Sequence, residues 1–268
     1  MPVQLDLKSR AWLTAGALGV CLGLGLATPS SSAPETLASK PSVQTPAQKI
    51  DPNAVKALRD MSAFLQSLST FKLESEASLD VVTNDGQKVQ LDGVAQYKVR
   101  KSNAFAIDIV SDSWNRQYIY NGKEFTLYAP KLGFYATVPA PATNQATIAM
   151  IGDKFGISLP LDDLFRWSSA DGARADALES AFLVGTDTLE GVKTNHYAFR
   201  EGKIDWQIWI QQGGQPLPRK LVIVDRRDPA FPAYEARLTW TLNPPLTDED
   251  FVFRPGTDAK RIRITLQQ

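Results

Sequence analysis

The stretch "WQIWIQQGGQPLPRKLVIVD", Trp206 to Asp225, decides the fold, because it is typical of two antiparallel strands joined by a tight turn. Apolar and polar residues alternate before the turn, which is the pattern of a strand with one buried face. "GGQP" supplies the reversal, and Pro218 lies at the start of the return strand, where its missing N–H is tolerated. We expect a hairpin in the middle of a sheet, with Trp206 and Ile208 on one face and Trp209 on the other.

The same alternation continues on both sides of this hairpin. Upstream, six strands between residues 71 and 138 follow one another, with turn signals at "NDG" (84–86) and "NG" (121–122). Downstream, strands resume at residue 182 and run through 192–200, 203–211, 217–226 and 234–243, and "RIRITLQ" adds an edge strand. Strands joined by short turns form antiparallel sheets, and a wide sheet curls. We predict an α+β fold, mainly β, built as a single half-open antiparallel β-barrel of about 11 strands.

Helical patterns stand before and between the two groups of strands. Asp51 and Pro52 are a typical N-cap and first helical residue, and apolar residues then recur at three- and four-residue spacing for about five turns, to near Thr70. Between residues 139 and 181 the text "MIGDKFGISLPLDDLFRW" indicates short helices with apolar faces and glycines. Such helices would fill the interior of a barrel poorly, but they are suited to cover its opening as a lid. This favours a cavity over a solid interior.

The N-terminus is typical of a secretory signal peptide. Lys8 and Arg10 precede seventeen uncharged residues, followed by small and polar ones, so we predict a signal peptide over 1–27, cleaved after Ala27. An uncleaved anchor and acylation at Cys21 are the alternatives; the glycines of the segment weaken a spanning helix, and Val20 is large for the residue before an acylated cysteine. Residues 28–50 have the composition of a disordered linker, and 51–268 form the folded domain. Cleavage removes the one cysteine and places a disulfide-free domain in the periplasm.

Composition and motifs exclude several classes of function. Lys and Arg total 29 and Asp and Glu 29, which gives no basic excess for binding nucleic acid. The single histidine, His196, lies in a strand without the further ligands that a metal site needs, and no nucleophile or phosphate-loop motif is present. Acids at 162–163 and 248–250 are typical of helix starts. We predict neither enzyme activity nor a cofactor.

Four stretches together resemble a known family. They are "DPNAVKALRDMSAFLQSLSTFKLESEASLD" from residue 51, "YNGKEFTLYAPKLGFYATV" from residue 120, "WQIWIQQGGQPLPRKLVI" and "PPLTDEDFVFRPGTDAKRI" from residue 244. In this order they are similar to a family of predicted periplasmic proteins of unknown function with the LolA/LolB-like (lipoprotein carrier) fold. The resemblance implies a concave apolar sheet face that holds acyl chains beneath helical lids. No position here matches the arginine that the carriers' lid engages.

These observations favour an exported, periplasmic, non-enzymatic protein that binds a lipid or other apolar small molecule in a concave sheet. The alternative is an envelope sensor or scaffold with a filled barrel, acting on a lipoprotein or other envelope protein; contact with the membrane is expected to be transient. Alternation does not decide which face lines the cavity. The candidate wall residues are Phe105, Ile107, Ile109, Tyr118, Tyr120, Phe125, Leu127, Trp206, Ile208 and Trp240, and the candidate lid residues are Met150, Ile151, Phe155, Leu164 and Phe165.

Overall fold

A computed structural model describes residues 49–112, 114–159, 161 and 177–264. The predicted signal peptide and nearly all of the predicted linker lie outside these residues, and so do the acids at 162–163 and the lid candidates Leu164 and Phe165. Those predictions remain predictions. The remaining candidate residues all fall within the described ranges.

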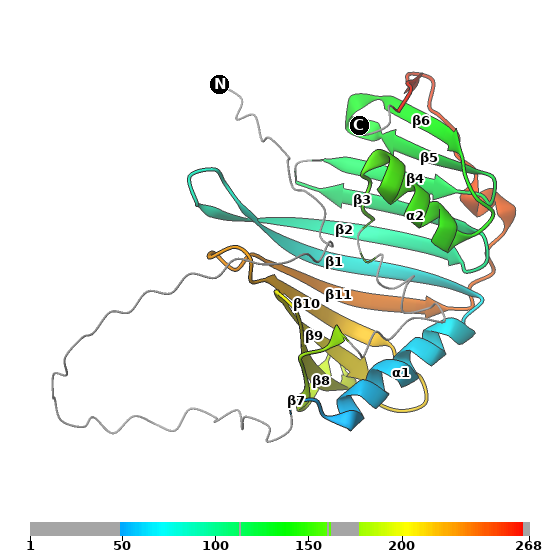
Figure 1. Ribbon diagram of the computed structural model, residues 1–268. Helices are drawn as coiled ribbons and strands as arrows, with labels where there is room; N and C mark the ends of the chain where they lie inside the picture. The colour runs from blue at the N-terminus through cyan, green and yellow to red at the C-terminus, as the bar shows by residue number, and fades with distance from the viewer. Residues whose placement is uncertain (1–48, 113, 160, 162–176, 265–268) are drawn as a thin grey trace, which may run out of the picture. The chain divides into compact units, whose positions relative to one another are not determined.

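The described chain is mainly β, with two α-helices and two short 3₁₀-helices (Figure 1). The first meander begins after helix α1 and the second begins after helix α2, in the order that the sequence predicts. The elements are α1 (Pro52–Ser67), β1 (Thr70–Val82), β2 (Lys88–Arg100), β3 (Ala104–Ser111), β4 (Asn115–Tyr120), β5 (Glu124–Ala129), η1 (Pro130–Leu132), β6 (Phe134–Pro139), α2 (Asn144–Phe155), β7 (Ser180–Leu189), β8 (Val192–Glu201), β9 (Ile204–Gln211), β10 (Pro218–Asp225), β11 (Ala233–Leu242), η3 (Asp248–Phe251) and β12 (Lys260–Arg261).

All the strands belong to one open sheet with the order β12-β6-β5-β4-β3-β2-β1-β11-β10-β9-β8-β7. Each meander is antiparallel, and the two are joined by antiparallel pairing of β1 with β11, in which Phe71 lies opposite Leu242. This confirms the predicted half-open antiparallel architecture, with twelve strands in place of about eleven. The last strand, β12, is two residues long and pairs parallel to β6.

The opening hairpin forms as predicted, but its place in the sheet is different. Strands β9 and β10 pair antiparallel, with Trp206 opposite Ile223 and a register shift between Pro218 and Lys220. The centre of the sheet belongs to β1, because β11 returns past the hairpin to pair with it. Alternation within a strand carries no information about pairing with a distant strand. The prediction from sequence therefore placed the hairpin too near the middle of the sheet.

Both helices pack on the same face of the sheet, which we call the inner face (Figure 1). Helix α1 begins where Asp51 accepts a hydrogen bond from the N–H of Asn53 at 2.8 Å, and it buries Val55, Leu58, Met61 and Leu65. It ends at Ser67, since β1 already begins at Thr70. Ile151 of α2 is fully buried in the same cluster. The fold therefore has two layers, and the core lies between the helices and the inner face.

The opposite face of the sheet, the outer face, is partly covered by the C-terminal segment. Thr247 and Asp250 form a capping box at η3, as the acidic run predicts. Asp250 accepts a hydrogen bond from Lys98 of β2 at 2.9 Å, and the Arg100 guanidinium lies 5.1 Å from the centre of the Phe251 ring. These contacts hold the segment against β2 before it reaches β6 and adds β12.

Candidate ligand-binding face

The predicted wall residues all lie on the inner face. Within each strand they occupy the alternate positions that face the helices, and all belong to, or pack against, one apolar cluster. Seven are buried and three are partly exposed. The buried ones are Phe105, Ile107, Ile109, Tyr118, Tyr120, Phe125 and Ile208, and the partly exposed ones are Leu127, Trp206 and Trp240.

Strands β3 to β5 carry an aromatic cluster. The ring centres of Phe105 and Tyr120 are 5.3 Å apart, and Tyr118 stacks on Phe125 with centres 6.3 Å apart. Phe105, Tyr120 and Phe125 have no exposed surface. Burial raises the pKa of Tyr118, and the positive charge of Arg116 opposes part of that rise. This half of the inner face is therefore closed in the structure.

Helix α2 is held at its N-terminal end. Thr143 caps it by accepting a hydrogen bond from the N–H of Ala146 at 3.2 Å, and Asn144 donates to the carbonyls of Arg100 and Lys101 at 3.0 Å each. At the other end Gly156 closes the helix with a φ of 64°, a conformation that suits glycine. The lid candidate Ile151 is buried, while Met150 and Phe155 are partly buried against the core.

The half of the inner face beneath α1 is built from tryptophans. Trp206 stacks on Phe199 with ring centres 4.2 Å apart, and Trp240 lies 5.2 Å from Phe71. The Trp240 indole N–H donates to the carbonyl of Pro218 at 2.8 Å, which fixes the ring while its apolar edge faces the core. An indole with a satisfied N–H is an apolar surface, so this region is suited to contact with a hydrocarbon chain.

Between the two aromatic regions the floor of the face consists of small side chains on β2, β1 and β11. Ser75 is 1% exposed, and its hydroxyl makes no hydrogen bond of good geometry with the described residues, although it lies close enough to the Tyr234 hydroxyl to oppose part of the rise in the pKa of that group. Burial is the larger effect and raises the pKa of Tyr234 to about 12. Sequence reasoning missed this region because its residues are small or isolated in the alternation. The small residues are Gly93, Ala95, Ser75, Ala77 and Ala236.

Trp209 faces the other way and packs on the outer face. It stacks on His196 with ring centres 3.8 Å apart, and the Lys220 ammonium lies 5.0 Å from its ring. His196 shares a 2.9 Å hydrogen bond with Gln207. Burial lowers the pKa of His196, so the ring is neutral at pH 7. This histidine is the sheet residue that the sequence predicts, and it stabilises the outer face.

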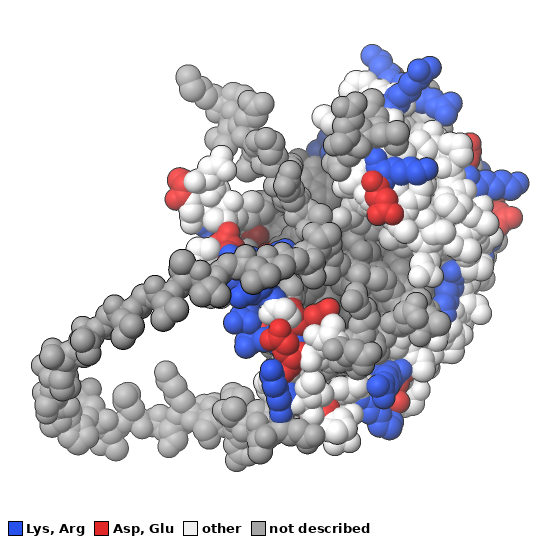
Figure 2. All heavy atoms as spheres, viewed as in Figure 1, with Lys and Arg blue, Asp and Glu red and all other residues white. Residues whose placement is uncertain are grey.

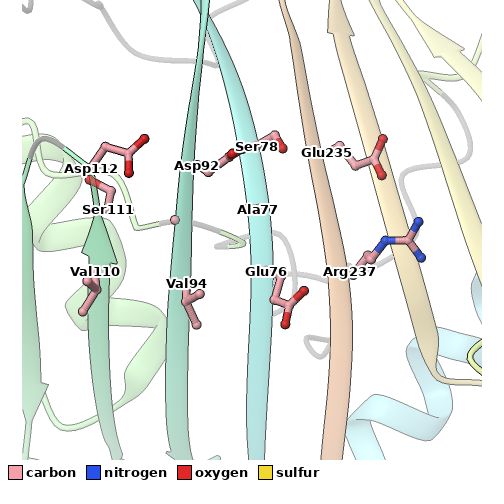
Figure 3. Close-up of a pocket in the computed structure, with 11 residues that line it drawn as sticks. Glu76, Ala77, Ser78, Asp92, Val94, Val110, Ser111, Asp112, Glu235 and Arg237 are labelled. Carbon is pink, nitrogen blue, oxygen red and sulfur yellow. The ribbon is translucent and has the colours of Figure 1, made fainter.

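A polar groove of about 510 Å³ crosses the outer face over β3, β2, β1 and β11 (Figure 3). Val94 and Val110 are exposed there between acidic side chains, and Glu235 is paired with Lys220 at 2.6 Å. Within the described residues no group of three or more acids, histidines or cysteines is close enough to bind a metal ion. The groove lies on the face opposite the predicted wall, and none of the candidate residues lines it. Its charged side chains are Glu76, Asp92, Asp112, Glu235 and Arg237.

Charge is distributed unevenly on the side that carries the helices. Figure 2 shows Lys, Arg, Asp and Glu side chains along the right-hand rim and in a mixed group near the middle of the view, with uncharged atoms over much of the rest of the described surface. The architecture defines a class of protein: an open, curled antiparallel sheet with one apolar, helix-covered face. This face has no assembled catalytic group among its described residues.

The chain belongs to the family described as predicted periplasmic protein (DUF2092), which it matches over residues 54–265. This confirms the family resemblance seen in the sequence and the predicted periplasmic location. In the described part of the chain, no helix is both long enough and apolar enough to span a membrane. No curated protein matches the chain.

Several solved structures are similar at low identity. LprF from Mycobacterium bovis is 12% identical with a TM-score of 0.44, and the match covers 78% of this chain and 100% of that one. Lipoprotein LppX from Mycobacterium tuberculosis is 10% identical with a TM-score of 0.39, covering 74% and 98%. A LolA superfamily protein from Nitrosomonas europaea is 9% identical with a TM-score of 0.34, covering 75% and 97%.

Proposed function

We propose that this periplasmic protein binds a lipid or other apolar small molecule on the inner face of its sheet and does so without catalysing a reaction. The observation that supports the proposal most is the composition of that face. From β5 across to β8, most inward positions carry aromatic and aliphatic side chains, which form one continuous cluster. This apolar surface is covered by two separate helices. It is larger than the area that contact with α1 alone would bury.

The driving force would be the removal of hydrocarbon from water. Each buried methylene contributes about 0.8 kcal/mol, so a chain of roughly sixteen carbons contributes on the order of 10 kcal/mol before the costs of ordering are subtracted. Part of this gain would offset the contacts that one short helix loses when it leaves the sheet. Binding would then proceed without a cavity that is already open.

Helix α2 is the element best suited to open. Its N-terminal end is tied to the β2–β3 turn by Asn144, whereas its C-terminal end is followed by Gly156. In the middle of the helix, only Thr147 and Ile151 are fully buried. Rotation about the Asn144 end would uncover Phe105, Tyr120 and Phe125 in one movement. We propose that α2 is the lid.

One observation favours the alternative of a scaffold with a filled interior. The aromatic residues beneath α2 are already completely buried, which is what a permanently packed core shows. The two functions differ in what accompanies the purified protein. A ligand-binding protein carries lipid at a fixed ratio, and a scaffold retains a protein partner from the envelope.

Native mass spectrometry of the protein purified from a bacterial envelope tests the proposal. We expect a bound apolar molecule in the wild type, and loss of that molecule on Trp206→Asp, which places a charge on the inner face. Phe231→Asp is the matched control, because Phe231 is an exposed aromatic residue, 53% accessible, outside the inner cluster. A wild-type protein that is always free of lipid, and takes up none from a lipid extract, would overturn the proposal.

A further inference from the structure

One cation is set into the apolar inner face. The inward positions of β1 to β6 carry apolar side chains, glycine or the hydroxyls of Ser75 and Ser111, with the exception of Arg116 on β4. Its orientation follows from the register: Arg116 lies opposite the buried Ile109 and two residues before the buried Tyr118. Its neighbour Gln117 faces outward and bonds to Asp108 at 3.2 Å.

Among the described residues, Arg116 has no acidic partner. Arg116 belongs to none of the ion pairs of the described residues, and its one hydrogen bond is a 2.8 Å contact to the carbonyl of the adjacent Asn115. The guanidinium lies 5.5 Å from the centre of the Trp114 ring, which packs against the inner cluster. A guanidinium has five donors, so most of its hydrogen-bonding capacity is unused here.

We infer that Arg116 binds the anionic head group of an amphiphile whose hydrocarbon chain lies along the inner face. The inference rests on the proposed function and adds the chemical class of the ligand. A guanidinium presents two parallel N–H groups that match a carboxylate or a phosphate, and its interaction with an anion strengthens where apolar side chains exclude water. Without an anion, a half-buried cation in an apolar wall is a cost to the fold.

The register also supplies a path for the chain. From Arg116 the paired residues across the sheet are Ile109 on β3, Ala95 on β2, Ser75 on β1 and Leu238 on β11. Five neighbouring strands span about 19 Å at about 4.8 Å per step. The middle of this row consists of small side chains, and so does the next row on one side, with Gly93, Ala77 and Ala236; the row on the other side contains Tyr97. A hydrocarbon chain extending from Arg116 across the strands would meet little steric hindrance along these two rows of small side chains.

Oleate and oleyl alcohol test the inference, because they share one hydrocarbon chain and differ in the charge of the head group. Binding of each to the full domain is measured by displacement of a fluorescent apolar probe, below the concentration at which either aggregates. We expect wild type to bind oleate about tenfold or more tightly than the alcohol, the scale of a charge-assisted hydrogen bond. We expect Arg116→Gln to remove that preference while leaving affinity for the alcohol unchanged. Lysophosphatidate in place of oleate distinguishes a phosphate source of the anion from a carboxylate source.

Arg237→Gln is the matched control, since it removes an arginine from the outer face and should leave the preference intact. The comparison of the two ligands in wild type does not depend on how a variant folds, and Arg116→Lys should retain part of the preference. Equal binding of oleate and alcohol by wild type, or an unchanged preference in Arg116→Gln, would overturn the inference and leave the proposed function standing. Failure of both ligands to bind would instead overturn the proposed function.

Discussion

The buried hydroxyl of Ser75 leads to a prediction about stability that is opposite to the one for an ordinary core side chain. Ser75 is 1% exposed on the central strand, and its Oγ has no hydrogen-bond partner of good geometry in the described part of the chain. Burying a hydroxyl without a partner costs about 1–3 kcal/mol in proteins, and the unfolded chain avoids that cost by solvating the group. Ser75→Ala removes the hydroxyl and leaves the β-carbon in place. We therefore expect the free energy of unfolding to rise by about 1 kcal/mol, where truncation of a core residue normally lowers it.

Urea denaturation followed by fluorescence or circular dichroism measures this change, and the thermal midpoint should rise by roughly 2–4 °C for a domain of this size. Ser78→Ala is the control: it makes the same change three residues along β1 on the outer face, and should alter stability by less than about 0.5 kcal/mol. A loss of stability in Ser75→Ala would refute the reasoning. It would mean that the hydroxyl is hydrogen-bonded in solution, with Tyr234 as the nearest candidate.

Two further predictions concern the same face. Burial raises the pKa of Tyr234 to about 12 from an ordinary value near 10, so the unfolded chain ionises first and stability should fall by up to about 3 kcal/mol between pH 10 and 12. Tyr234→Phe should reduce that fall in a denaturation series, and an identical series would contradict the assignment. Phe105→Ala should lower the free energy of unfolding by about 3–5 kcal/mol, because Phe105 is fully buried against Tyr120 and Phe125. A loss below about 1 kcal/mol would indicate that the aromatic cluster collapses easily or is loosely packed.

The alternation of the strands predicted much of the candidate face. The wall residues from Phe105 to Leu127 and from Trp206 to Trp240 share the inner face because one choice of register fixes every side chain of a strand. What alternation left open was which of the two faces the helices cover. That was settled by α1 and α2, which pack on the side of Ile208 and leave Trp209 to stack on His196.

Arg116 shows why the sequence did not mark part of the proposed site. In the sequence it stands in "SWNRQYIY" as one more polar residue beside a turn, and nothing local marks it as facing an apolar surface. Its significance depends on strands β3 and β2, which place Ile109 opposite it and Ala95 next in the same row. Ser75 was missed for the same reason, because a serine among alternating residues usually lies on the solvent side.

The sequence by itself determined the local structure of this protein: the helix start at Asp51, the turns, and two meanders of strands, each set by residues a few positions apart. The tertiary structure alone decided that β1 pairs with β11, which places the first and last long strands side by side and makes one sheet of two meanders. The physical reason is the distance along the chain over which each kind of interaction acts. Periodicity and turn chemistry act over a few residues, whereas that pairing joins segments more than 150 residues apart, and its stability comes from the shared apolar face that only the assembled sheet provides.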